Sequence, residues 1–133
     1  MVDFAIANGI TYFDTAYKYH AGESEIFCRE ALVKRHPRES FCLADKLPTW
    51  LCHSPAEVTA KFEEQLGKCG VEYFDFYLHH AMSAQRHEKH TNTNAYEIVK
   101  EFKEQGKVRH IGMSFHDSAE VLDKILTDRP EIE

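Results

Sequence analysis

Side chains that could handle protons stand at or just after the short apolar runs of the sequence. Asp14 ends one run and is followed by Tyr17 and Tyr19, while Lys46 and His80 stand at the ends of the next two. A tyrosine hydroxyl is a weak acid at neutral pH, but a neighbouring lysine ammonium favours its phenolate. An aspartate can hold such a lysine charged, and a neutral histidine can donate a hydrogen bond to a carbonyl oxygen. Together they would polarise and protonate a carbonyl group, and the hydride would have to come from a cofactor.

The elements that must position these groups follow one another at regular intervals. Strand-like runs begin at residues 11, 41, 74 and 108, and their largely non-alternating apolar sequence is typical of strands buried on both faces of a parallel sheet. Helical patterns are expected between and around them, over residues 4–9, 24–35, 54–70, 94–106 and from 118 onward. The alternation predicts βαβ units, so that the carboxyl ends of three neighbouring strands lie within roughly 10 Å of one another.

Three local signals set boundaries within this pattern. Ser54 followed by Pro55 predicts the start of a helix, and Gly70 stands where a helix-ending glycine belongs. The stretch from Ser83 to Thr93 is too polar for a core element and is expected to be a loop.

Composition excludes several classes of protein. The 133 residues carry 16 Lys and Arg against 22 Asp and Glu, a formal net charge of −6, which does not fit a nucleic-acid-binding surface. No apolar run approaches the roughly 20 residues that span a bilayer. The four cysteines have no metal-binding or redox spacing and, with no export signal at the start, indicate reduced thiols in the cytoplasm. The length predicts a single domain over residues 1–133.

Four linked segments resemble the aldo-keto reductase superfamily. In chain order they are residues 8–19 (NGITYFDTAYKY) with 22–25 (GESE), Lys46 after the second strand, residues 75–80 (DFYLHH), and residues 106–114 (GKVRHIGMS). The resemblance implies an α/β fold, a partial (β/α)8 TIM barrel with about four parallel strands and flanking helices. It also implies reduction of an aldehyde or ketone to an alcohol by NADPH or NADH, with no metal.

The family pattern assigns roles to particular residues. By this resemblance Tyr19 is the proton donor, Lys46 favours its ionisation, Asp14 orients Lys46, and His80 positions the carbonyl. The family spacing of five residues from the aspartate selects Tyr19 over its rival Tyr17. For the cofactor, the resemblance assigns Asp14 and Ser114, the latter at the serine that contacts the nicotinamide carboxamide. The family often has Asn after that serine, and Phe115 stands there instead.

The largest departure from the family is length. A complete barrel has roughly 250 residues, and this sequence resembles only its second strand through the helix after its fifth. A sheet of four strands would leave two edges unpaired, so we expect an incomplete barrel that forms homo-oligomers through these edges.

Two alternative functions compete with carbonyl reduction. The chain could be a truncated, non-catalytic barrel that acts as an assembly or interaction module, or an inactive fragment. It could also be a metal-dependent hydrolase that uses His79, His80, His87 and His90. Adjacent histidines on a strand point to opposite faces, which disfavours a metal site and makes His79 a packed or loop histidine. Trp50 either lines the substrate mouth or covers a loop.

Overall fold

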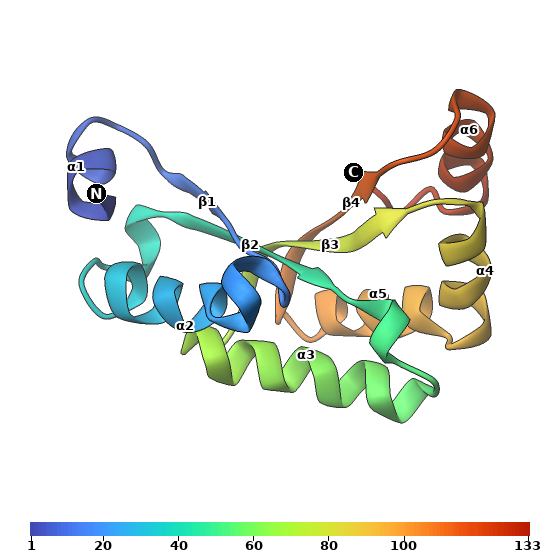
Figure 1. The fold of residues 1–133 in the computed structure, drawn as a ribbon, viewed down its shortest axis with the longest axis horizontal. Coiled ribbons are helices and arrows are strands. Elements are labelled where there is room, and N and C mark those ends of the chain that lie inside the picture. The colour runs from blue at the N-terminus through green and yellow to red at the C-terminus, as the bar shows by residue number, and fades with distance from the viewer.

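The computed structural model describes residues 1–133. They form an α/β fold in which most of the helices lie on one side of an open sheet (Figure 1). The elements in chain order are α1 (Val2–Ala7), β1 (Tyr12–Asp14), a 3₁₀ turn (Tyr19–Gly22), α2 (Ser24–Cys28) continued by a π turn (Arg29–Val33), a 3₁₀ turn (Arg38–Ser40), β2 (Cys42–Leu47), a 3₁₀ turn (Thr49–Leu51), α3 (Pro55–Cys69), β3 (Phe74–Met82), α4 (Ala84–Asn92), α5 (Ala95–Glu104), β4 (Val108–Phe115) and α6 (Ala119–Asp128).

The four strands form one parallel sheet in the order β1-β2-β3-β4. Ala44 of β2 pairs with Phe76 of β3, and Phe76 pairs with His110 of β4. Each connection is a crossover through at least one helix, as parallel pairing of consecutive strands requires. The expected fold class, a partial barrel of four parallel strands with flanking helices, is therefore confirmed.

The boundaries of α3 follow from its terminal residues. The Ser54 Oγ accepts a hydrogen bond from the Glu57 backbone N–H at 3.3 Å, and Pro55 occupies the first helical position. At the other end Gly70 has φ +69, the left-handed conformation that glycine adopts without steric cost, and its N–H donates to Leu66 O at 2.8 Å. Both predicted boundaries are confirmed.

The core lies between the sheet and the helices below it, α2, α3 and α5 (Figure 1). Phe62 of α3 stacks on Phe102 of α5 at 4.0 Å and meets Phe74 and Tyr77 of β3 edge-on. Phe62, Phe74 and Tyr77 are fully buried. This aromatic cluster joins α3 and α5 to β3, the strand that carries His80.

The opposite face of the sheet is not covered by a helix, so the expectation that the strands are buried on both faces is wrong in part. Tyr12 of β1 is 48% exposed, and Arg109 and His110 of β4 are exposed. Along this face Tyr12 meets Phe76 edge-on at 5.4 Å, and Phe76 stacks on His110 at 5.0 Å. The sequence predicted that these aromatic side chains belong to a second buried face, but in the structure they lie on a face of the sheet that no helix covers.

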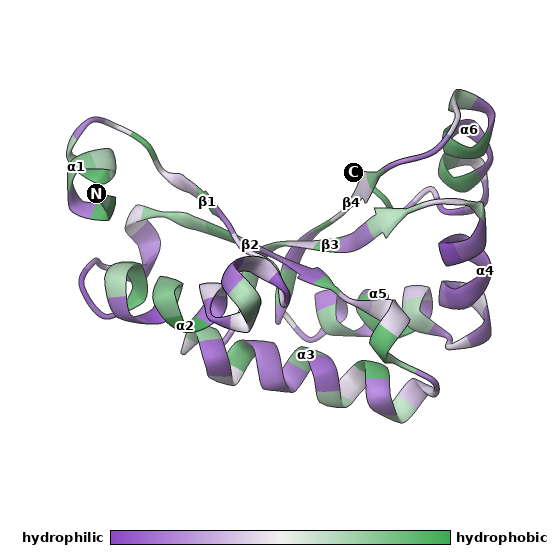
Figure 2. Cartoon of the chain, in the orientation of Figure 1, coloured by the Kyte–Doolittle hydropathy of each residue, from purple (hydrophilic) through white to green (hydrophobic).

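The polar stretch from Ser83 to Thr93, expected as a loop, forms α4. The Ser83 Oγ accepts from the Arg86 N–H at 3.3 Å and begins the helix, and Thr93 donates to Lys89 O at 2.8 Å near its end. Figure 2 shows α4 as a mostly hydrophilic helix. The buried residue of this helix is His90 rather than an aliphatic residue, which is why the sequence lacks an apolar stripe.

Two whole-chain features bear on the remaining expectations. No helix of the structure has the length and apolar character needed to cross a membrane. The four cysteines are free thiols.

Candidate active site

Lys46 is the centre of the site. It lies in β2 with 4% of its surface exposed, and its Nζ donates to Asp14 Oδ1, to Thr15 O at 2.9 Å and to Tyr19 Oη at 3.2 Å. These three acceptors use all the hydrogens of the ammonium group. The amine is therefore fixed beside the Tyr19 hydroxyl, with the Asp14 carboxylate compensating its charge.

Tyr19 is held over Lys46 by a tight turn. Its backbone N–H donates to Ala16 O at 3.0 Å, and the next two residues, His20 and Ala21, have φ +52 and +57. Two successive non-glycine residues in the left-handed region carry conformational strain, as often occurs at functional sites. The Tyr19 ring lies 4.5 Å from Lys46 Nζ and is 40% exposed, so a small molecule can reach its hydroxyl.

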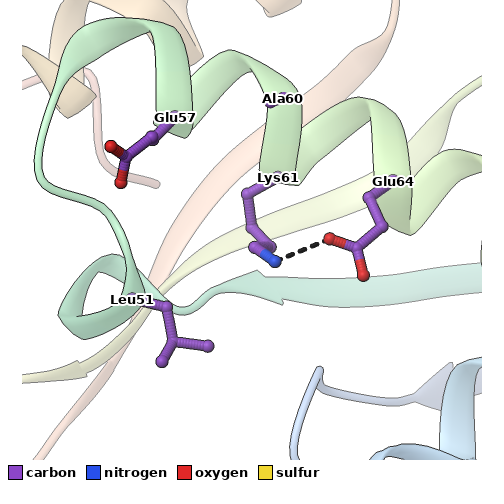
Figure 3. A pocket seen from close by; sticks show the side chains of 5 residues that line it. All are labelled: Leu51, Glu57, Ala60, Lys61 and Glu64. Atoms are coloured by element: carbon purple, nitrogen blue, oxygen red, sulfur yellow. Dashed lines mark hydrogen bonds and ion pairs between the residues drawn. The ribbon is translucent and has the colours of Figure 1, made fainter.

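Tyr17, the rival proton donor, is bound elsewhere. Its hydroxyl donates to Glu64 Oε1 at 2.9 Å and accepts from Lys61 Nζ at 3.0 Å, both on α3. Figure 3 shows Lys61 and Glu64 directed toward each other beside a shallow pocket of about 180 Å³ that Leu51 also lines. Tyr17 therefore faces α3, whereas Tyr19 faces Lys46.

The two adjacent histidines of β3 point to opposite sides, as expected. His80 meets the Tyr19 ring edge-on at 6.1 Å, whereas His79 is 1% exposed and packs against His90 and Tyr96. Burial, followed by the charges of Lys46 and Arg86, lowers the pKa of His80 to about 4. The His80 ring is thus neutral at pH 7 and can donate one N–H to a carbonyl oxygen.

Trp50 lies beside His80 of this site. It belongs to the 3₁₀ turn after β2, and its ring lies 5.0 Å from the His80 ring. The sequence left open whether Trp50 lines the substrate mouth or covers a loop, and the structure shows that it adjoins a site residue.

A buried hydrogen-bonded network of Gln65, Glu25 and Tyr77 contacts the backbone of Lys46. The sequence did not predict this network. Gln65 Nε2 donates to Lys46 O at 3.1 Å and to Glu25 Oε1 at 2.9 Å, and Tyr77 donates to Gln65 Oε1 at 2.6 Å. Burial, with the neighbouring Glu25 carboxylate, raises the pKa of Asp45 well above its usual range. The sequence feature that could have predicted this network is Gln65, a polar residue within the apolar stripe of α3.

Ser114 lies on β4, the strand beside the one that carries His80. Its Oγ accepts from the Ala81 N–H at 2.6 Å, which leaves the hydroxyl hydrogen free to donate. It has no hydrogen bond to Asp14, Tyr19 or Lys46. The structure thus joins three of the expected residues in one hydrogen-bonded group, sets His80 against it, and places Ser114 on the neighbouring strand.

The arrangement has a definite chemical capacity. The Tyr19 hydroxyl can donate its hydrogen to an oxygen placed beside it, because its own oxygen already accepts from the Lys46 amine. The neutral His80 ring is a second hydrogen-bond donor close by. No group of three or more His, Cys, Asp or Glu side chains in the structure has metal-binding geometry.

Comparisons with known proteins agree with this geometry. The model of the Aldo/keto reductase family matches residues 1–133. A protein of Glycine max described as "Probable aldo-keto reductase 1" is 34% identical over 125 residues, covering 86% of this chain and 34% of that protein.

Solved structures show the same fold. An aldo-keto reductase from Bacillus halodurans in its holo form is 25% identical with a TM-score of 0.77, and the match covers 98% of this chain and 44% of that one. An aldo-keto reductase from Klebsiella pneumoniae in complex with NADPH is 24% identical with a TM-score of 0.78, covering 96% and 43%. The chain thus spans about a third of the Glycine max relative and less than half of each structure.

Proposed function

Because the chain belongs to the aldo-keto reductase family, we propose that it carries the proton-transfer part of a carbonyl reductase site. The proposed reaction is reduction of an aldehyde or ketone to an alcohol with NADPH, or NADH, as the cofactor. One observation carries the proposal: a buried Lys46 amine bonded to both Asp14 and the Tyr19 hydroxyl, with the His80 ring against Tyr19.

Each of the four side chains has a separate part in this reaction. The carbonyl oxygen accepts hydrogen bonds from the Tyr19 hydroxyl and the neutral His80 ring, which orient it and polarise the C=O bond. As that bond becomes a single bond, Tyr19 gives its proton to the oxygen. Lys46 stabilises the phenolate, and Asp14 keeps the amine aimed at Tyr19. The nicotinamide cofactor, when bound, supplies the hydride that reduces the carbonyl carbon.

The residues present fit the nicotinamide end of such a cofactor. The Ser114 hydroxyl, with its hydrogen uncommitted, suits the oxygen of a carboxamide, and Asp14 is 38% exposed beside Tyr19. Phe115 offers no hydrogen bond from its side chain, so Ser114 would hold the carboxamide without the family's usual Asn. We propose NADPH as the ligand because a similar structure was solved in complex with it.

The first test is a titration of the folded chain with NADPH, followed by nicotinamide fluorescence. We expect a saturable signal, and we expect Ser114→Ala to weaken binding about fivefold, the effect of one lost hydrogen bond. Ser40→Ala is the matched control, since Ser40 bonds only to Pro37 O in an exposed turn, and it should bind as the wild type does. A folded sample without a saturable signal would remove the cofactor proposal.

We also propose that residues 1–133 form one incomplete barrel domain that self-associates. Two observations support a second copy as the partner: β1 and β4 each pair with only one strand, and the open face carries the half-exposed Tyr12 next to Phe76. The same features favour the second candidate function, an assembly module without activity.

The four free cysteines support the proposal that the chain works in the reducing cytoplasm.

Sedimentation of the purified chain tests self-association. We expect a dimer or larger species at micromolar concentration, and we expect Tyr12→Lys to shift it toward monomer by placing a charge on the open face. Ile26→Lys is the control, because Ile26 is a hydrophobic residue of similar exposure, 40%, on α2. A wild type that sediments as a stable monomer would contradict this part of the proposal.

A further inference from the structure

Three positively charged side chains of the molecule have no carboxylate partner, and all three surround Trp50. Of the 16 Lys and Arg residues, thirteen form an ion pair with Asp or Glu. The remaining ones are Lys18, Arg86 and Lys89. In a chain with a net charge of −6, cations left unpaired in one place favour an anion that is not part of the chain.

The three cations come together from separate parts of the sequence. Lys18 Nζ lies 5.7 Å from the centre of the Trp50 ring, and the Arg86 guanidinium carbon lies 4.9 Å from it. Lys89, one turn after Arg86 on α4, lines a pocket of about 270 Å³ together with Trp50, Arg86 and Gln85. No carboxylate lines this pocket.

The pocket adjoins the site described above. The centre of the Trp50 ring lies 5.0 Å from the centre of the His80 ring and 4.9 Å from the guanidinium carbon of Arg86. A flat molecule that packs on Trp50 would therefore lie near both His80 and Arg86. Arg86 and Lys89 remain able to bind it. Arg86 gives one nitrogen to Ala81 O, and the Nζ of Lys89 lies 3.4 Å from Nδ1 of His53 with no carboxylate partner.

We propose that the carbonyl substrate carries a carboxylate, which Arg86 and Lys89 bind while its flat body packs on Trp50. The inference rests on the proposed function for the position of the carbonyl, at Tyr19 and His80. Lys18 adds positive charge at the rim and favours capture of anions from solution. The substrate class is thus an aromatic or similarly flat aldehyde or ketone acid, with the two groups at opposite ends.

Fluorescence of Trp50, the only tryptophan of the chain, measures this binding without any turnover. The probes are 4-(hydroxymethyl)benzoate, the alcohol that reduction of a flat aldehyde acid would give, and its amide, which has the same shape without the charge. We expect the carboxylate to bind at least about tenfold more tightly than the amide, because charge-assisted hydrogen bonds to Arg and Lys are strong. Raising the ionic strength to about 0.5 M should remove most of this difference.

Substitutions of Arg86 and Lys89 test whether these residues bind the carboxylate. Lys89→Gln should weaken binding of the carboxylate about three- to tenfold and leave the amide unchanged. Arg86→Gln should weaken it further, and Arg86→Lys, which keeps the charge, should restore part of the loss. Lys124→Gln is the control, because Lys124 is exposed on α6 and pairs with Asp128.

The result can be read independently of the reductase proposal. Carboxylate and amide that bind equally, or Lys89→Gln and Arg86→Gln variants that bind the carboxylate as Lys124→Gln does, would overturn the inference even if the chain reduces carbonyls. Charge-dependent binding that follows the variants would support the anion site at Arg86 and Lys89 even if replacing Tyr19 leaves reduction unaffected.

Discussion

Acidification below about pH 6.5 is expected to destabilise the fold strongly, because two histidines are buried as neutral rings. His79 and His90 are 1% and 0% exposed, and three of their four ring nitrogens have no hydrogen-bond partner. Burial lowers the pKa of His79 well below its usual value of 6.5 and that of His90 to about 4. The positive charges of Arg86 and Arg129, together with His87, add to the effect at His90.

The direction in which folding stability changes with pH follows from proton linkage. In the unfolded chain these histidines bind protons near pH 6.5, whereas in the folded chain His90 binds one only near pH 4. The folding stability is therefore highest above pH 6.5 and decreases as the pH falls from 6.5 to about 4. For His90 alone the difference corresponds to about 3 kcal/mol. Asp45 acts in the opposite direction, because its raised pKa means that acidification relieves a buried charge.

Denaturant unfolding between pH 7 and pH 4 measures this effect, and a pair of variants isolates it from Asp45. His79→Leu should be at least as stable as the wild type at pH 7, since it removes two buried unpartnered nitrogens, and should lose less stability on acidification. His116→Leu, a change at an exposed histidine, should follow the wild type. Equal pH dependence in His79→Leu and the wild type would show that His79 is not held neutral by the fold.

Much of the sheet and the central polar group could be predicted because both depend on local sequence signals. The apolar runs marked all four strands, and Ser54 and Gly70 marked the ends of α3. Once strands alternate with helices, parallel pairing brings Asp14 and Lys46 to one edge of the sheet. The family spacing separated Tyr19 from Tyr17, and the structure directs their hydroxyls to different partners.

What the sequence did not reveal depends on contacts between distant residues. Helix α4 was missed because its buried position is occupied by His90, so no apolar period is visible. The open face of β1 was missed because Tyr12 has the same character whether or not a helix covers it. The cations around Trp50 were missed because a lysine or arginine is recognised as unpaired only when all carboxylates have been placed in space.

Replacing Tyr19 by phenylalanine is expected to have the largest effect on activity. The change removes one oxygen, the atom that accepts from Lys46 Nζ at 3.2 Å and that we propose as the proton donor. Loss of a positioned general acid typically lowers the rate about 10²- to 10⁴-fold. Tyr17→Phe removes the same atom from a hydroxyl bound to Lys61 and Glu64, and should leave the rate within about twofold of the wild type.

The most direct test of the site is the rate at which the folded wild type, Tyr19→Phe and Tyr17→Phe oxidise NADPH with an aromatic aldehyde as the acceptor. Circular dichroism of each variant establishes that the fold is retained. We predict a measurable rate in the wild type, nearly the same rate in Tyr17→Phe and a loss of about 10²-fold or more in Tyr19→Phe. No oxidation above background by the wild type, or an undiminished rate in Tyr19→Phe, would contradict the proposal that Asp14, Lys46 and His80 act on a carbonyl through Tyr19.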